Sequence, residues 1–245
     1  ALSAGTGARL IDSEGHIRIH TPNLTGSSLY VSSNGVLFGA YNATNMSVLR
    51  LDSQGHEVSY ITNISFPTIA PTALRFYNDS VAVLRNDTSV MLCRLYPEFT
   101  VTSMDTHPLD GIAVGEIDGE PGVEILGYRG RTLYFFSVEG SDLKKLWDVT
   151  ATSSVRAIAL GDLDGDGIEE VVVMTKDGMF ALFYNPDSRK WDYYYEITYD
   201  YPAKMGGRNG AVVVMDSDGD GKGEVYMDNG KNGGLVYIEV EFHYK

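Results

Sequence analysis

Acidic residues recur at alternate positions in three short segments of the chain, each interrupted by glycine. The most regular segment reads Asp162-Leu-Asp164-Gly-Asp166-Gly-Ile168-Glu169-Glu170 (loop 2), and the pattern returns as Asp216-Ser-Asp218-Gly-Asp220-Gly-Lys222-Gly-Glu224 (loop 3). A weaker copy comes earlier, Glu116-Ile-Asp118-Gly-Glu120-Pro-Gly-Val-Glu124 (loop 1). Alternating carboxylates, with glycines that permit a sharp turn, can wrap their oxygens around a hard cation such as Ca²⁺.

The pattern predicts side-chain metal ligands at loop positions 1, 3, 5 and 9, and a backbone carbonyl ligand at position 7 of the two regular copies. The predicted ligands are Asp162, Asp164, Asp166, Ile168 and Glu170 in loop 2; Asp216, Asp218, Asp220, Lys222 and Glu224 in loop 3; and Glu116, Asp118, Glu120 and Glu124 in loop 1. Loop 1 departs from the pattern, because two of its acids are the longer Glu and Pro121 stands where glycine is expected. We therefore expect two Ca²⁺ sites and leave a third, in loop 1, open. The alternative for all three loops is an acidic turn held by hydrogen bonds alone.

The position of the closing acid separates these loops from an EF-hand. An EF-hand loop also starts with acids at positions 1, 3 and 5, but it needs a bidentate Glu at position 12. Position 12 is Val173 in loop 2 and Met227 in loop 3, and an apolar, strand-like run follows each position-9 acid directly. The loops are therefore expected between two strands.

The negative charge of the chain comes mainly from these loops. The net charge is −14, and the three loops hold 13 of the 33 Asp and Glu residues. A strongly acidic chain argues against binding to nucleic acid and to anionic membrane surfaces. No apolar run approaches the roughly 18 residues that would span a bilayer, so no membrane insertion is expected in this segment.

The rest of the chain reads as short strands separated by turns rich in Gly, Asn, Asp and Ser, with no convincing amphipathic helix. Groups of four strands can be placed at about 27–62, 72–105, 109–150 and 154–199, and a last group starts near 208. Steps of about 45 residues have the size of a four-stranded propeller blade. The sequence predicts an all-β chain, a single β-propeller domain over residues 1–245.

The two ends of the chain bear on the number of blades. Residues 8–19 resemble residues 48–59, which form the outer half of a predicted group, so the N-terminal strands are expected to complete a blade begun by the C-terminal strands. Pairing the ends in one blade would close the ring and remove a free sheet edge. This gives about five blades, or six if residues 1–26 and 208–245 belong to separate partial blades.

Residues 157–173 resemble an FG-GAP/VCBS-type repeat, as found in the β-propeller of integrin α subunits and in many microbial surface proteins. The resemblance covers roughly residues 110–240. It implies that each loop joins the two innermost strands of a blade and binds Ca²⁺ through the residues named above. The ninth residue is more often Asp in that family, whereas this chain has Glu. The first two predicted groups lack the loop, so their assignment depends on strand rhythm alone.

Six Asn-X-Ser/Thr sequons lie in the first 90 residues, at Asn23, Asn42, Asn45, Asn63, Asn78 and Asn86. Composition alone would give roughly one or two sequons. One interpretation is a secreted glycoprotein, and the other is a turn composition rich in Asn, Ser and Thr. The single cysteine, Cys93, allows no internal disulfide and lies in an apolar run, where a buried, inert thiol is expected.

No catalytic constellation appears in the sequence, so a non-enzymatic role is expected. The aromatic run 191–201, which contains Trp191, is interpreted as an outer strand packed between blades, with a sugar- or protein-binding surface as the alternative. The favoured function is an extracellular or cell-surface calcium-binding module for adhesion or for surface-layer or filament assembly. Its expected partners are a protein or glycan on a cell surface or matrix, or further copies of itself. The alternative is a secreted carbohydrate-binding or polysaccharide-active propeller.

Overall fold

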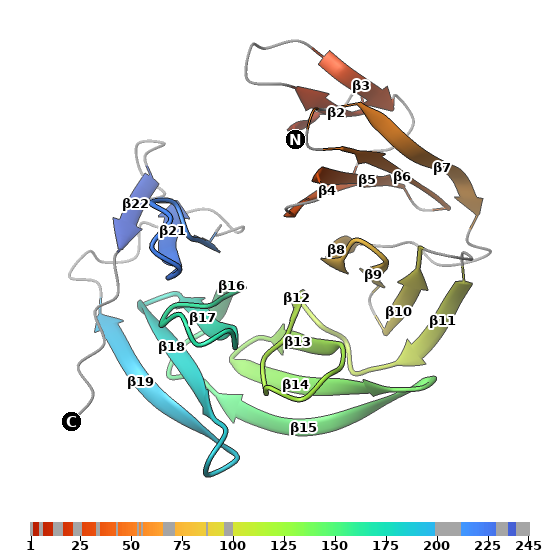
Figure 1. The fold of residues 1–245 in the computed structure, drawn as a ribbon. Coiled ribbons are helices and arrows are strands. Elements are labelled where there is room, and N and C mark those ends of the chain that lie inside the picture. The colour runs from red at the N-terminus through yellow and green to blue at the C-terminus, as the bar shows by residue number, and fades with distance from the viewer. Residues whose placement is uncertain are drawn as a thin grey trace. The chain divides into compact units, whose positions relative to one another are not determined.

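The computed structural model is built from antiparallel sheets (Figure 1). It describes residues 2–4, 7–11, 17–21, 26–32, 35–42, 44–52, 54, 56–65, 72–86, 88–95, 100–198, 212–228 and 235–238. These residues form two compact units, one comprising Ala1–Leu109 with Ser141–Leu143, and the other Asp110–Gly140 with Lys144–Lys245. The described residues contain no helix with the length and apolar character needed to cross a membrane.

The first unit holds three sheets, in which strands pair in the order of the sequence. Their strands are β1 (Leu2–Ala4), β2 (Gly7–Ile11) and β3 (Ile17–Thr21); β4 (Gly26–Ser32), β5 (Gly35–Tyr41), β6 (Asn45–Leu51) and β7 (Glu57–Ser65); and β8 (Ala73–Asn78), β9 (Val81–Arg85), β10 (Ser89–Arg94) and β11 (Thr100–Asp105). The first strands β4 and β8 lie side by side, and alternate apolar side chains of the two four-stranded sheets share one core.

The second unit repeats this plan. Its strands are β12 (Gly111–Gly115), β13 (Glu124–Arg129), β14 (Thr132–Glu139) and β15 (Asp142–Thr150); β16 (Val155–Gly161), β17 (Glu170–Thr175), β18 (Gly178–Asn185) and β19 (Lys190–Thr198); and β20 (Val212–Met215), β21 (Glu224–Asp228) and β22 (Leu235–Ile238). The first strand of each sheet lies beside the first strand of the next, β12 beside β16 and β16 beside β20.

Strand β17 shows why a continuous apolar run forms a strand here. All six of its residues are buried, because the sheet is covered on both faces. Val171 and Val173 belong to the core shared with β13 and β14, whereas Val172 and Met174 belong to the core shared with β21. The two-residue period of a strand thus sends neighbouring side chains into different cores. The outermost strand β15 is largely exposed, as expected for a sheet edge.

The four predicted strand groups coincide with the four four-stranded sheets, so the all-β, blade-like organisation is confirmed. Among the described strands, β1–β3 and β20–β22 form two three-stranded sheets, and the choice between five and six blades stays a prediction. The pairing of the chain ends in one blade and the single domain over residues 1–245 stay predictions.

Candidate metal centres

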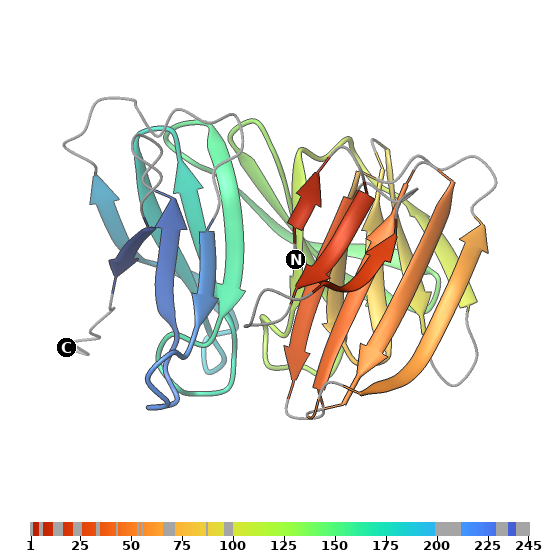
Figure 2. The same ribbon diagram turned by 90° about the horizontal axis from the view of Figure 1, so that it is seen from above.

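Each acidic loop joins the first and second strands of its sheet, as the position-9 acid predicts. Loop 1 follows β12, loop 2 follows β16 and loop 3 follows β20. The closing acid is in every case the first residue of the next strand: Glu124 of β13, Glu170 of β17 and Glu224 of β21. Figure 2 shows loops 2 and 3, in teal and blue, at the same end of their sheets. The strands therefore fix both ends of every loop.

Loop 2 is folded around its own carboxylates. Asp162 accepts the backbone N–H of Gly165 (2.7 Å) through Oδ1 and that of Gly167 (2.9 Å) through Oδ2. Asp164 accepts the N–H of Asp166 at 3.1 Å, and Asp166 accepts that of Ile168 at 2.7 Å. These bonds hold the carboxylates of loop 2 within a single turn of the chain.

The glycines of loop 2 are required by the backbone. Gly165 and Gly167 have φ angles of 85° and 89°, in the left-handed region that side chains resist. The equivalent Gly219 and Gly221 of loop 3 have φ angles of 85° and 88°. The two regular loops thus share one conformation, as their sequences indicate.

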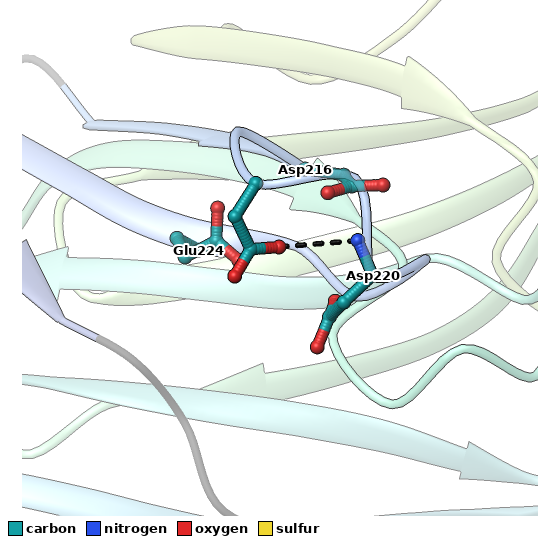
Figure 3. A group of neighbouring side chains, drawn as sticks. Asp216, Asp220 and Glu224 are labelled. Carbon is teal, nitrogen blue, oxygen red and sulfur yellow. Dashed lines mark hydrogen bonds between the residues drawn. The ribbon is translucent and has the colours of Figure 1, made fainter.

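Loop 3 repeats the hydrogen bonds of loop 2. Asp216 accepts the N–H of Gly219 (2.7 Å) and of Gly221 (3.0 Å), and Asp220 accepts that of Lys222 at 2.8 Å. The labelled acids Asp216, Asp220 and Glu224 surround this single turn (Figure 3). Lys222 and Ile168 occupy position 7 of their loops, and their carbonyl oxygens stay the predicted backbone ligands.

Loop 1 keeps part of this arrangement. Gly119 at position 4 has a φ of 71°, but Pro121 replaces the second glycine. Asp118 accepts the N–H of Glu120 at 3.0 Å, the bond that Asp164 makes in loop 2. The side chain of Glu120 lies 3.7 Å from Arg189 in an exposed ion pair.

Carboxylate oxygens converge in all three loops. The residues that can bring one oxygen each within 4.8 Å of one another are Glu116, Asp118 and Glu124; Asp162, Asp164 and Glu170; and Asp216, Asp218, Asp220 and Glu224. Two oxygens that bind the same Ca²⁺ at about 2.4 Å can be at most about 4.8 Å apart. The spacing therefore fits a calcium shell. The position-5 acid belongs to this grouping in loop 3, whereas Asp166 and Glu120 lie outside it.

The closing glutamates are buried carboxylates, with exposed fractions of 1% for Glu124, 2% for Glu170 and 4% for Glu224. Burial, followed by repulsion from neighbouring acids, raises the pKa of Glu124 to about 8 and that of Glu170 also to about 8. Among the residues that the structure describes, none forms a hydrogen bond with the buried Oε2 of Glu124. A buried, unpartnered carboxylate oxygen among other acids is a donor set that a divalent cation would satisfy.

Position 2 is a residue that the sequence reasoning missed. The backbone N–H of Leu163 donates to Glu170 at 2.7 Å, and that of Ser217 donates to Glu224 at 2.8 Å. Ile117 makes the corresponding backbone bond to Glu124. Ile117 and Leu163 are fully buried, so in loops 1 and 2 this residue anchors the loop in the core while its N–H orients the closing acid, whereas Ser217 of loop 3 is exposed. In loops 1 and 2, the sequence signal for this role is an apolar residue between two acids.

The loops are also bonded to one another within the second unit. Glu169 donates its N–H to the carbonyl of Glu116 at 2.8 Å, and Gly223 donates to the carbonyl of Asp162 at 2.6 Å. In both cases, position 8 of one loop meets position 1 of the preceding loop. Glu169 adds a side-chain bond, accepting the N–H of Glu116 at 2.9 Å. The sequence reasoning assigned no role to Glu169.

Three of the sequon asparagines lie in turns that their own side chains stabilise. Asn42, Asn78 and Asn86 each accept at least two backbone N–H groups through Oδ1, at 2.6–3.0 Å. Asn45 is the first residue of β6, and Asn63 lies in β7. Asn23 lies outside the described residues. The turn role of these asparagines supports the compositional interpretation, although Nδ2 is the atom that carries a glycan.

Comparison with known proteins supports the repeat and the fold. Residues 162–227, which include loops 2 and 3, match the FG-GAP-like repeat family. No curated protein sequence matches the chain. Solved structures with a similar fold include BBS1N in complex with ARL6DN, with 13% identity, a TM-score of 0.59, and coverage of 92% of this chain and 70% of that chain.

Two further similar structures are the SapL1 lectin in complex with α-methyl fucoside and the WD40 domain of SCAP from fission yeast. The lectin has 10% identity and a TM-score of 0.57, covering 88% of this chain and 80% of that one. The WD40 domain has 12% identity and a TM-score of 0.55, covering 87% of this chain and 52% of that one. WD40 repeats build β-propellers, so these likenesses show the fold.

Proposed function

Because the chain carries an FG-GAP-like repeat in a β-propeller fold, we propose that it is a non-enzymatic extracellular binding module whose acidic loops hold Ca²⁺. The observation that carries this proposal is the convergence of carboxylates in each loop around a closing Glu that the core buries. Without a cation, each cluster gathers like charges next to a desolvated carboxylate. With Ca²⁺ bound, the same oxygens become ligands and the loop is cross-linked to two strands.

The role of the metal in this proposal is structural. The side chains of Asp216, Asp218 and Asp220 would hold Ca²⁺ from the loop, and Glu224 would hold it from the first position of β21. When bound, the ion supplies charge neutralisation and a rigid connection. Extracellular modules often bind Ca²⁺ with dissociation constants of about 10⁻⁴–10⁻³ M. Sites of that strength fill outside cells, which agrees with the excess of sequons.

The proposed partners are a protein or a glycan on a cell surface or matrix. Of the proteins with a similar fold, BBS1N is in complex with ARL6DN, and the SapL1 lectin is in complex with α-methyl fucoside. A propeller presents loops and edges on a rigid frame, which suits either kind of partner. A glycan array, run beside a screen for polysaccharide degradation, separates a binding module from an enzyme, because turnover of any polysaccharide contradicts the proposed role.

Thermal unfolding with and without Ca²⁺ tests the metal proposal. A site with free Ca²⁺ at ten times its dissociation constant stabilises the fold by about 1.4 kcal/mol. Two such sites should raise Tm by roughly 6–12 °C in a chain of this length. Excess EGTA should reverse the increase, and Mg²⁺ at the same concentration should not replace it. An unchanged Tm in EGTA, with no metal detected by elemental analysis, contradicts the proposal.

A further inference from the structure

A pocket of about 400 Å³ lies in the second unit, next to the hairpin that joins β18 and β19. Its lining includes Trp147, Tyr184, Trp191, Arg189, Lys190 and Asp118. The volume is in the range of small-molecule sites, about 300–1,000 Å³. Aromatic walls with a few polar groups at their edge are the usual composition of such sites.

The aromatic wall is held rigidly by the core. The rings of Trp147 and Trp191 are nearly parallel, at 6°, with centroids 5.9 Å apart. The buried ring of Phe135 lies 4.6 Å from Trp191 and 5.1 Å from Trp147. Tyr184 extends the wall at 5.3 Å from Trp191. Both indoles remain half-buried, so part of this ordered aromatic surface is open to the pocket.

Arg189 is placed at the pocket by an unusual backbone conformation. Within the described ranges, it is the one residue other than glycine with a positive φ, 53°. A side chain in the left-handed region costs about 1–2 kcal/mol, and glycine would avoid that cost. Strained residues of this kind concentrate at functional sites. The guanidinium lies 3.7 Å from Glu120, in a pair whose side chains are 77% and 66% exposed, so the pair contributes little to stability.

The polar groups of the pocket supply both donors and acceptors. Arg189 and Lys190 are donors, whereas Asp118 is an acceptor. When Glu120, the ion-pair partner of Arg189, is counted with them, the pocket and its edge hold two positive and two negative charges. A ligand with hydroxyl groups, an apolar face and no charge matches this combination, because hydroxyls both donate and accept, and the C–H face of a sugar ring packs on an indole.

We propose that this pocket binds a neutral pyranose residue of a glycan, stacked on the Trp147–Trp191 wall and hydrogen-bonded by Arg189 and Lys190, neither of which is a predicted metal ligand. The inference rests on the proposed role as a binding module and names its ligand and its site. It does not need calcium in the loops. Sugar binding is therefore tested at saturating Ca²⁺. Absence of sugar binding there contradicts the pocket proposal, and it leaves the metal proposal to the thermal unfolding test.

Intrinsic fluorescence tests the proposal directly, since both tryptophans of the chain line the pocket. The protein is titrated at saturating Ca²⁺ with methyl glycosides of neutral hexoses and deoxyhexoses, and with the matching uronic acids. We expect a saturable change in emission with at least one neutral glycoside, confirmed by calorimetry. Absence of binding across the panel, or binding of uronic acids alone, overturns the proposal.

Two variants test the residues. Trp147→Ala should weaken sugar binding at least tenfold, and so should Arg189→Gly. The second variant still tests the proposal if the first fails to fold, because glycine suits the positive φ and removes the whole side chain with its guanidinium. Arg131→Ala, an exposed arginine outside the pocket, is the matched control and should bind as the unchanged protein does. Full affinity in a folded Arg189→Gly protein contradicts the assignment of Arg189.

Discussion

Gly223 donates its backbone N–H to the carbonyl oxygen of Asp162, 2.6 Å away, and so connects the third acidic loop to the second. Glu169 makes the equivalent bond to Glu116 at 2.8 Å, which connects the second loop to the first. The same two loop positions are used each time. The acidic loops are therefore not independent turns, since position 8 of loop 2 and of loop 3 is fixed by the loop that precedes it.

The first prediction concerns this connection. A Cβ at Gly223 would lie 2.6 Å from Val214 Cγ1 and 2.9 Å from the carbonyl oxygen of Asp162. Gly223→Ala should therefore lower the free energy of unfolding by about 1–3 kcal/mol, as overpacked substitutions do. Chemical denaturation measures the change.

Gly140→Ala is the control for that substitution. Gly140 has a φ of 65°, but a Cβ there would meet nothing within 4 Å. Gly140→Ala should lower the free energy of unfolding only by the conformational penalty of a left-handed side chain, about 1–2 kcal/mol. If Gly223→Ala leaves the free energy of unfolding unchanged, the close approach of the two loops is wrong.

The second prediction separates one metal site from the others. Asp218 is a predicted ligand in loop 3, where four carboxylates converge. Asp218→Asn removes one charge from that shell and should weaken Ca²⁺ binding there about tenfold or more, because ligand charge tunes calcium affinity. Calorimetric titration of the metal-free protein should then show one Ca²⁺ site fewer in the concentration range that fills the unchanged protein. Asp187→Asn, in an exposed turn outside the loops, should leave the stoichiometry unchanged. Equal stoichiometry in both variants argues against metal in loop 3.

The third prediction concerns Cys93, which is fully buried in β10. Burial raises the pKa of its thiol to about 12. Since only the thiolate reacts, a disulfide reagent at pH 8 should leave the native thiol almost unmodified and should modify it fully in denaturant. In the unfolded chain the thiol ionises near pH 8.5. The folded state then binds more protons between about pH 9 and 12, so stability should fall as pH rises through that range. Rapid modification of the native protein would contradict the burial.

The fourth prediction distinguishes the two interpretations of the sequons. Asn86 Oδ1 accepts the N–H groups of Thr88 and Ser89 at 2.8 and 2.6 Å. In protein made without glycosylation, Asn86→Ala should cost about 1–2 kcal/mol, whereas Asn86→Asp keeps the acceptor and should cost little. Denaturation of the two variants measures this. Equal stability of Asn86→Ala and the unchanged protein would leave the turn interpretation without support.

Most of the strand pattern could be predicted from the sequence, because the two-residue apolar period and the turn residues are local properties. The predicted group at 154–199 corresponds to β16–β19, from Val155 to Thr198. The loop spacing was equally local, so the place of Glu170 at the start of a strand was predictable. The number of sheets was harder to predict, because it depends on which distant strands the N- and C-terminal strands pair with. The described strands at the two ends form three-stranded sheets.

Other features depended on contacts between distant residues. Glu169 accepts a hydrogen bond from Glu116, 53 residues earlier, and no local pattern predicts such a pair. The stacking of Trp147 on Trp191 likewise joins the outer strands of two sheets. The aromatic run alone indicated an outer strand, which β19 confirms, but it did not indicate a second tryptophan or the arginine beside it.

The ligand spacing, the glycine positions and the strand rhythm can thus be read from the chain alone, since each follows from backbone geometry over a few residues. The desolvation of particular carboxylates, the bonds between loops, and the meeting of Trp147, Trp191 and Arg189 depend on the folded protein. Desolvation and long-range packing depend on what covers a residue. That cover comes from strands far away in the sequence.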